Sequence, residues 1–328
     1  MQHLIQSWHI IFMMIFTVSV VVTMDPAKAT QEAQQSASQE DEIVVTGQKK
    51  RMAEFQNLII NHFRVSGGGR NNGQYARFAQ PVCPSVAGLA ERQSKAIEDR
   101  IRAIAEMAEI EVAKEDCRPN IFVAVVEDGG SEIKLLRSKK NRLFGSLTDR
   151  ERDKIEQSGG PVYSWKATQT LGSDSRHSAN AGSLTFMADA NGSGGGAALG
   201  GAAVNGQVTQ VKSKISRSTV EGIGYSYLLI DSKALQGVSA AQLADYAAMV
   251  SLIDIQVGSD IEVPDGSILS LFSETEDKSL RPTSLSGGDL LLLRGLYKVP
   301  ANVKASLQRS AMIHTMSEGL KNPERIDR

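Results

Sequence analysis

The chain has 328 residues, a formal net charge of −1 and an aromatic content of 5%. The near-neutral charge argues against a polyanionic partner, and the scarcity of aromatic side chains adds to the case against nucleic acid binding. The length corresponds to one domain of about 250 residues with flexible additions, since domains commonly hold roughly 100–200 residues.

An apolar run from residue 10 to residue 22 marks the N-terminus. The run is short for a membrane span, and the small-x-small pattern Ala27-Lys28-Ala29 is typical of a signal-peptide cleavage site. We therefore predict a signal peptide over residues 1–29, cleaved near Ala29. The protein is then periplasmic or secreted, with no transmembrane helix after signal removal. The segment carries no Lys or Arg before Lys28, so an uncleaved anchor is the alternative.

Residues 30–75 are predicted to be a flexible linker, because residues 30–42 are too polar to pack. Within it, residues 52–63 hold enough apolar side chains for a helix. Residues 42–47 of the linker read EIVVTG, and the candidate partner-binding residues are Ile43, Val44, Val45 and Thr46. A short run of β propensity in a flexible tail can add a strand to the sheet edge of a partner. The alternative is a short strand or plain linker.

The EIVVTG segment resembles the TonB box near the mature N-terminus of outer-membrane receptors of Gram-negative bacteria. That resemblance implies a place in the Gram-negative cell envelope and an envelope protein as the partner. Nothing downstream has the length of a receptor barrel, so the resemblance extends to the motif alone.

Cys83 and Cys117 are the two cysteines of the chain, and in an exported protein such a pair predicts a disulfide. The bond would close a loop of about 35 residues and contribute about 3–4 kcal/mol in the chain-entropy model. A metal site is disfavoured because two thiolates need two further ligands, and a redox pair usually has the Cys-x-x-Cys spacing.

Helical spacing of Ile97, Ile101 and Ile104 predicts a helix between the cysteines, and the apolar run 121–126 suits a strand buried on both faces. Further strands are predicted at residues 161–170, 208–215 and 223–230. This order indicates an α+β or α/β fold with a small mixed sheet packed by helices. Thr148 and Glu151 form a capping box that predicts a short polar helix.

The predicted domain covers residues 76–316 and contains a mobile insertion. Residues 171–207 are rich in Gly, Ser and Ala, a composition that buries too little surface to offset the entropy of ordering. The charged residues 317–328 are predicted to be a frayed tail.

The most informative stretch runs from Val238 to Tyr297. Ser239 and Gln242 form a capping box that opens a helix with an apolar stripe. A tight apolar turn and a loop follow, and then a second helix that Ser286 or Asp289 can cap.

This stretch of about sixty residues resembles zincin-type metalloproteases of the metzincin kind. In that family a metal-binding helix is followed by a Ser-hydrophobic turn beneath the site and by a closing helix of the form Leu-Ser-x-x-Asp…Leu-Tyr. Ser267-Ile268-Leu269 is similar to the turn, and Leu285–Asp289 with Leu296-Tyr297 is similar to the closing helix. The resemblance implies a zincin-like scaffold.

The chain departs from the family pattern at the metal. The family motif is His-Glu-x-x-His, in which two imidazoles bind zinc and the Glu is the general base. The corresponding window, residues 244–248, reads Ala-Asp-Tyr-Ala-Ala. Asp245 is a weak catalytic candidate where the base would lie, and a solvated helix carboxylate is the alternative. Leu269 stands where the family uses Met. We therefore predict no metal ligand, no cofactor and no metal-dependent catalysis.

The expected function is that of an exported, non-catalytic cell-envelope protein whose zincin-like scaffold is an interaction module. One alternative is an envelope hydrolase that acts on peptide or glycan through Asp245. A structural secreted domain without a ligand is the other.

Overall fold

The computed structural model describes residues 48–67, 73–145, 147–173, 216–258, 261–273 and 280–321. All of them belong to one compact unit, Gln48–Arg328, separate from Met1–Gly47. The predicted signal peptide, the EIVVTG segment, most of the insertion and the predicted strand at 208–215 lie outside the described residues. None of the described helices combines the length and the apolar character that a membrane span needs.

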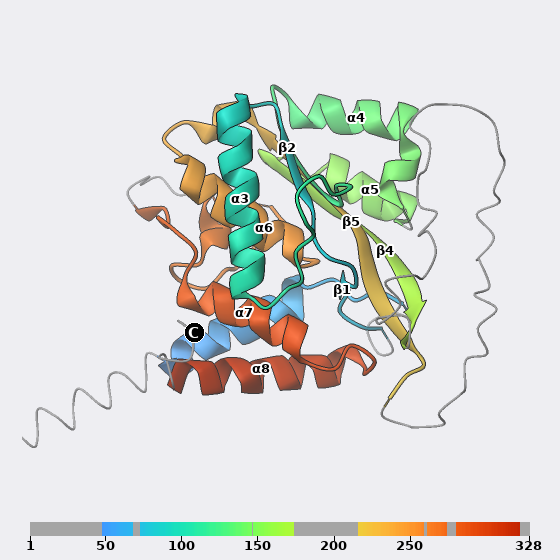
Figure 1. Ribbon diagram of the computed structural model, residues 1–328, viewed down its shortest axis with the longest axis vertical. Coiled ribbons are helices and arrows are strands. Elements are labelled where there is room, and N and C mark those ends of the chain that lie inside the picture. The colour runs from blue at the N-terminus through green and yellow to red at the C-terminus, as the bar shows by residue number, and fades with distance from the viewer. Residues whose placement is uncertain are drawn as a thin grey trace, which may run out of the picture. The chain divides into compact units, whose positions relative to one another are not determined.

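A mixed sheet of five strands lies at the centre of the unit, as the sequence predicts (Figure 1). Strand β5 (Thr219–Asp231) is its longest member. Along one edge of β5, β4 (Val162–Gly172) runs antiparallel over nearly the whole length. The other edge pairs in parallel with β1 (Arg77–Phe78) near its start and with β3 (Ile121–Val126) towards its end. Strand β2 (Pro84–Ala87) extends the sheet beyond β3, also in parallel.

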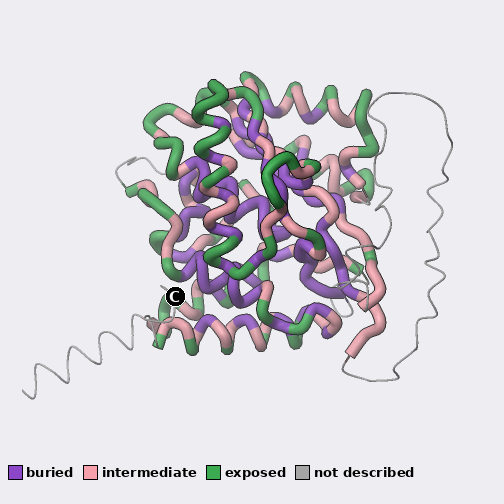
Figure 2. The backbone as a smooth tube through the Cα atoms, viewed as in Figure 1, coloured by how far each residue is buried: buried purple, intermediate pink, exposed green. Residues whose placement is uncertain are grey.

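Helices pack on both faces of the sheet, because neighbouring side chains of a strand point to opposite sides. One face carries the main core, formed with the helix over residues 48–62 and with α3 (Glu91–Met107), α6 (Ala240–Leu252), α7 (Gly287–Lys298) and α8 (Ala305–Lys321). The other face carries a smaller core with α4 (Gly129–Lys139), the 3-10 helix η1 (Asn141–Phe144) and α5 (Asp149–Glu156). Figure 2 shows the buried backbone inside these layers and exposed turns on the outer sides of α3 and α4.

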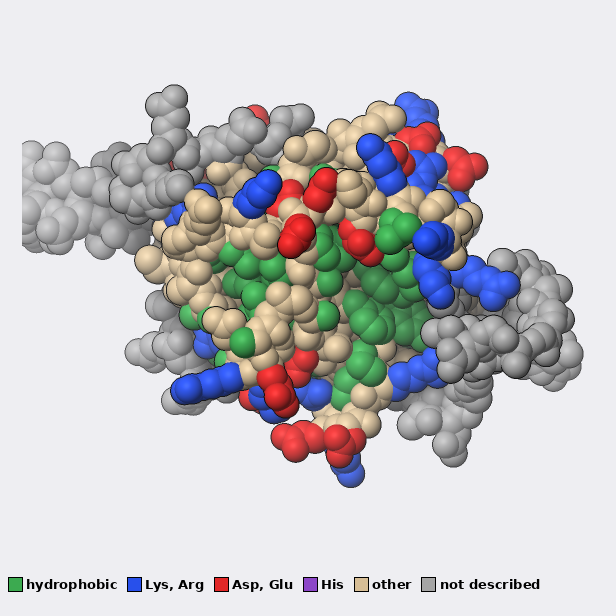
Figure 3. Space-filling model, turned by 90° about the horizontal axis from the view of Figure 1, so that it is seen from above, with side chains coloured by type: hydrophobic (Ala, Val, Ile, Leu, Met, Phe, Trp, Pro, Cys, Tyr) green, Lys and Arg blue, Asp and Glu red, His purple; other side chains and the backbone are tan. Residues whose placement is uncertain are grey.

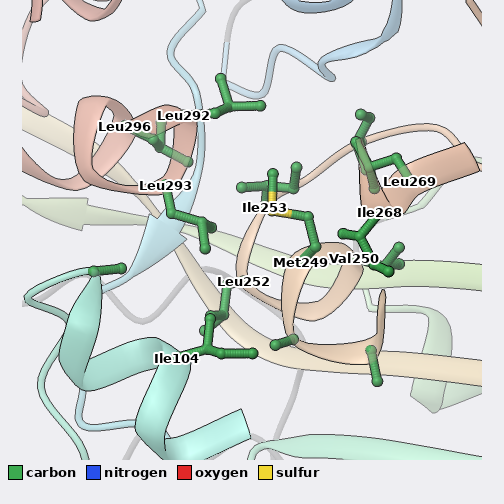
Figure 4. Close-up of a cluster of buried hydrophobic side chains, with 14 of the residues drawn as sticks. Ile104, Met249, Val250, Leu252, Ile253, Ile268, Leu269, Leu292, Leu293 and Leu296 are labelled. Carbon is green, nitrogen blue, oxygen red and sulfur yellow. The ribbon is translucent and has the colours of Figure 1, made fainter. Parts of the chain in front are cut away.

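Helix α6 is the most deeply buried helix among the described residues. Every residue from Leu243 to Leu252 is buried, beyond the single apolar stripe that the sequence predicts. A helix that is enclosed on all sides can be apolar all round. Figure 4 shows the reason: Met249, Val250 and Leu252 lie among side chains of α3, α7 and the turn η4 (Ile268–Ser270).

The predicted disulfide and capping boxes are confirmed. Cys83 and Cys117 are bonded and close a loop with a sequence separation of 34. The bond joins the residue before β2 to the connection between α3 and β3. Capping boxes begin α5 at Thr148, α6 at Ser239 and α7 at Ser286.

The structure differs from the predicted boundaries at both ends of the domain. Residues 48–62, expected within the linker 30–75, form a helix whose Phe55, Leu58 and Ile59 are buried in the main core. Helix α8 continues to Lys321, beyond the predicted end at residue 316, because its later turns pack against α7.

Strand β3 is buried on one face only. Ile121, Val123 and Val125 are buried, while the alternate residues are half-buried. Phe122 stacks on Tyr227 of β5 with ring centroids 5.2 Å apart. An aromatic row therefore leads from the half-buried side of β3 to Trp165, which is buried in the smaller core.

Candidate functional site

Residues 244–248 of α6, the window compared above with the zincin motif, hold no metal-binding side chain at the two positions of the imidazoles. Ala244 and Ala248 are both buried, at 1% and 0% exposure, and neither side chain can donate electrons to a metal. Within the described ranges, no group of three or more His, Cys, Asp or Glu residues is placed to hold a metal ion. His62 is half-buried and His314 is exposed, while His177 lies outside the described residues.

Asp245 is buried, and both of its carboxylate oxygens accept hydrogen bonds. Its side chain is 0% exposed and accepts from Arg100 of α3, with Nε to Oδ1 at 2.7 Å and Nη2 to Oδ2 at 3.2 Å. The backbone N–H of Leu285 also donates to Oδ2 at 2.7 Å. The hydrogen bond to Asp245 raises the pKa of Arg100. Asp245 thus holds α6 to α3 and to the segment before α7.

Asp289 fixes the turn that lies next to α6. Oδ1 accepts from Ser267 Oγ at 2.5 Å, and Oδ2 accepts from the N–H of Ile268 at 2.9 Å. The N–H and the hydroxyl of Ser286 donate to the same Oδ2 at 2.9 and 2.8 Å. Burial raises the pKa of Asp289, and these hydrogen bonds oppose that rise. One carboxylate therefore ties η4 to the first turn of α7.

A second set of buried polar groups lies on the core face of β4 and around it. We call it the β4 cluster; its members are Arg64, Ser164, Lys166, Ser226 and Asp254. Ser164 and Lys166 are two residues apart and so share one face of the strand. Lys166 Nζ donates to Ser164 Oγ at 2.8 Å. Ser226 of β5 is the cross-strand partner of Lys166.

Lys166 is a fully enclosed lysine, with 2% of its surface exposed. Loss of hydration lowers its pKa to about 7, against the opposing effect of Asp254. Burial in turn raises the pKa of Asp254, while Arg64 and Lys166 pull it down. The cluster thus contains a lysine that is partly neutral near pH 7.

The polar groups of the β4 cluster are incompletely paired. Arg64 Nε lies 4.0 Å from Asp254 Oδ1, which is too long for a hydrogen bond. Among the described residues, the buried atoms Arg64 Nε and Ser226 Oγ have no hydrogen-bond partner. Buried polar atoms are usually paired, and of these two Arg64 also lines a cavity, where its Nε can bind a ligand or water.

A cavity of about 170 Å³ opens beside this cluster, and its lining includes Arg64, Glu151, Lys154, Ser164 and Gln256. A smaller cavity of about 20 Å³ adjoins it, and its lining includes Tyr246 of α6 and Leu269 of η4. Both cavities include Val162 in their lining. Together they form a cleft along the start of β4.

The backbone of β4 is open towards this cleft. The N–H of Asp231 donates to the carbonyl of Pro161 at 2.8 Å, which sets the phase of the antiparallel ladder. Hydrogen-bonded and non-bonded pairs alternate in such a ladder. The N–H and C=O groups of Val162, Ser164 and Lys166 therefore point away from β5, towards an edge that pairs with no other strand among the described residues.

Comparison of the chain with family models, with curated proteins and with solved structures gave no match. The function is therefore inferred from the residues and their geometry.

The sequence points to Asp245 and gives no direct indication of the β4 cluster. Residues 161–170 were predicted as a strand, and the positions of Val162, Ser164 and Lys166 two apart place the lysine on the face of a core valine. A lysine on an apolar strand face is the signal that could have found the site. The partners of Lys166 come from distant segments that no local pattern joins.

Proposed function

We propose that the protein is an exported cell-envelope binding module, built on a zincin-like frame that performs no metal-dependent catalysis. The observation that carries the proposal is the state of the α6 window. The two positions that would bind zinc are buried alanines. The residue at the position of the base accepts three hydrogen bonds from Arg100 and Leu285.

The zincin-like frame itself is supported by the arrangement of three elements. Helix α6 contacts η4, and Tyr246 packs edge-on against Phe272 with ring centroids 4.8 Å apart. Asp289 then joins η4 to the capped start of α7. A buried helix, a serine-led turn against it and a closing helix follow one another in the order that the resemblance implies.

Export is supported by the sequence of residues 1–29 and by the bond between Cys83 and Cys117. Disulfides persist in oxidising compartments such as the bacterial periplasm. The segment with Ile43, Val44, Val45 and Thr46 is the part of the chain that we assign to strand addition on an envelope partner.

A binding role is also supported by the surface of the described domain. The cleft lies along β4, whose outer edge has no strand partner in the described part of the chain, and such edges bind extended peptide segments through main-chain hydrogen bonds. On the face seen in Figure 3, hydrophobic side chains form a patch bordered by Lys, Arg, Asp and Glu side chains. Apolar patches with a polar rim are typical of interaction surfaces.

A hydrolase that works through Asp245 is less well supported. A general base needs an oxygen within reach of the proton that it removes. Both oxygens of Asp245 already accept hydrogen bonds, and Asp245 is not among the residues that line the cleft.

Metal analysis of the purified protein tests the loss of metal chemistry. We expect substoichiometric zinc after expression in zinc-supplemented medium, and a melting temperature that a chelator leaves unchanged. One tightly bound zinc per chain would refute the proposal.

A pull-down from outer-membrane extract tests the binding role. The bait is the chain without its predicted signal peptide, and the matched controls are a deletion of residues 42–47 and a variant in which the same six residues are scrambled. We expect an envelope protein that the full bait retains and that both controls lose. Equal recovery with all three baits would exclude this segment as the binding element.

A further inference from the structure

We propose that Ser164 and Lys166 form a nucleophile and general-base pair that transfers the acyl group of small carboxylic esters in the cavity beside β4. This activity goes beyond the proposed binding role and does not depend on the zincin-like frame. It rests on the contact between the two side chains, on the cavity and on the unpaired donor of Arg64.

The contact is the first step of the argument. Lys166 Nζ and Ser164 Oγ are 2.8 Å apart, within the range in which a base can remove the proton of a serine. Both side chains extend from one face of β4, so the strand itself holds the pair in register. Ser164 lines the cavity and Lys166 does not, which places the nucleophile in front and the base behind it.

The environment of Lys166 suits a base. A lysine must be neutral to accept a proton, and burial favours the neutral form. The charged groups that act on it are Asp254, which favours the protonated form, and Arg64, which opposes it. Serine and lysine pairs are a recognised variant of the nucleophile and base arrangement in acyl transfer.

Arg64 supplies the third requirement, a donor for the developing oxyanion. It lines the same cavity as Ser164, and its buried Nε has no hydrogen-bond partner among the described residues. The N–H of Ser164 also points to the free edge of β4. Donors that are fixed before the reaction stabilise the charge that appears on a carbonyl oxygen.

The reaction proceeds in two balanced halves. Ser164 Oγ attacks the ester carbonyl carbon while its proton moves to Lys166 Nζ, and the negative charge that forms on the carbonyl oxygen lies near Arg64. The carbon–oxygen bond to the leaving group then breaks, and Lys166 returns the proton to the departing alcohol. Water attacks the acyl-serine in the second half, with Lys166 again taking and returning one proton, and releases the carboxylic acid.

The cavity sets the size of the acyl group. Its volume is about 170 Å³. One water needs roughly 10–15 Å³ on this scale, so the space suits an acyl group of a few carbons together with water. Acetyl esters are therefore the probe of choice.

Labelling with a fluorophosphonate probe tests the nucleophile on the full chain without its predicted signal peptide. We expect one adduct, mapped to Ser164 by peptide mass analysis, and slow hydrolysis of p-nitrophenyl acetate. Ser164→Ala should lower both rates by about 100-fold or more. Ser251→Ala is the matched control, because Ser251 is also buried but lies on α6 and outside the lining of the cavity. It should label like the unmodified chain.

Lys166→Met tests the base, because methionine keeps an apolar chain of similar length and cannot accept the proton. We expect labelling to fall by about 100-fold or more while the melting temperature is kept or raised. In the unmodified chain the labelling rate should rise with pH through the titration of Lys166 and then level off. Unchanged labelling of Ser164→Ala or of Lys166→Met, or no labelling of the folded chain, would overturn the proposal. Zinc bound to the protein would refute the proposed binding function but would not overturn this proposal. The two proposals are therefore tested independently.

Discussion

Two regions of the molecule differ in how completely their buried charged groups are hydrogen-bonded. In the frame of α6, η4 and α7, both oxygens of Asp245 and of Asp289 accept hydrogen bonds at 3.2 Å or less. In the β4 cluster, Lys166 has one hydrogen bond, and Arg64 Nε and Ser226 Oγ have none among the described residues. A fully paired network stabilises a fold, whereas a partly paired one costs stability. The paired groups of α6, η4 and α7 therefore stabilise the fold, whereas the incompletely paired groups of the β4 cluster are available to bind a ligand.

The largest effect is expected at Asp289. Asp289→Ala removes the acceptor of four hydrogen bonds and leaves the buried N–H of Ile268 unpaired. Each buried unpaired group costs about 1–3 kcal/mol, so we expect a loss of about 3–5 kcal/mol in the free energy of unfolding. Urea titration measures it, with Asp265→Ala, at an exposed site, as the control. A loss below about 1 kcal/mol would show that η4 is held by packing alone.

A smaller loss is expected from Arg100→Ala. The substitution leaves the buried carboxylate of Asp245 with one donor, the N–H of Leu285. Breaking a buried ion pair can cost 3–5 kcal/mol, but the Arg100 side chain is 42% exposed and solvent screens part of the interaction. We therefore expect about 2 kcal/mol. A double-mutant cycle with Asp245→Asn should show coupling between the two sites, and strict additivity would contradict the pairing.

Placing one imidazole in α6 should weaken the fold and create no metal site. Ala248 is 0% exposed, so Ala248→His forces a large polar ring into a packed core. Overpacking costs about 1–3 kcal/mol. Thermal unfolding with and without zinc is the measurement. A melting temperature that zinc raises would mean that the window is closer to a metal site than the buried alanines indicate.

Lys166→Met is the substitution in this series that is not expected to lower stability near neutral pH, because it removes a buried group whose charge is costly, and it changes the pH dependence. Folding lowers the pKa of Lys166 from 10.5 to about 7, so between these values the unfolded chain binds more protons than the folded one. Stability then rises with pH in this window, by at most about 1.4 kcal/mol per unit. Urea titrations from pH 7 to pH 10 should show this rise in the unmodified chain and a weaker one in Lys166→Met. Parallel curves would mean that Lys166 is charged in the folded state.

The sequence predicts most of the fold, because its strongest signals are local. The capping boxes at Thr148, Ser239 and Ser286 depend on residues three apart, and each begins a helix. The disulfide follows from the presence of two cysteines in a chain that is predicted to be exported. These features need no knowledge of distant segments.

The candidate site could not be predicted in this way, because its contacts join segments that are far apart in the chain. Asp245 was interpreted as a possible base or a solvated carboxylate, and its partner Arg100 lies 145 residues earlier in the chain. Burial is the main cause of the lowered pKa of Lys166, and the charged groups that act on it, Asp254 and Arg64, come from distant segments of the chain. Neither pairing has a local pattern, so the sequence could indicate which residues are unusual but not what they contact.

The position of β5 in the sheet has a consequence for folding. Strand β5 lies between β4 on one side and β1 and β3 on the other, yet it begins only at Thr219. A nascent chain that ends before this residue has no central strand, and the pairing of Arg77 with Gly222 must close a loop of well over a hundred residues. Such closures slow folding. The sheet is therefore completed only after most of the chain has been synthesised, and this long interval before folding would suit the export that we propose.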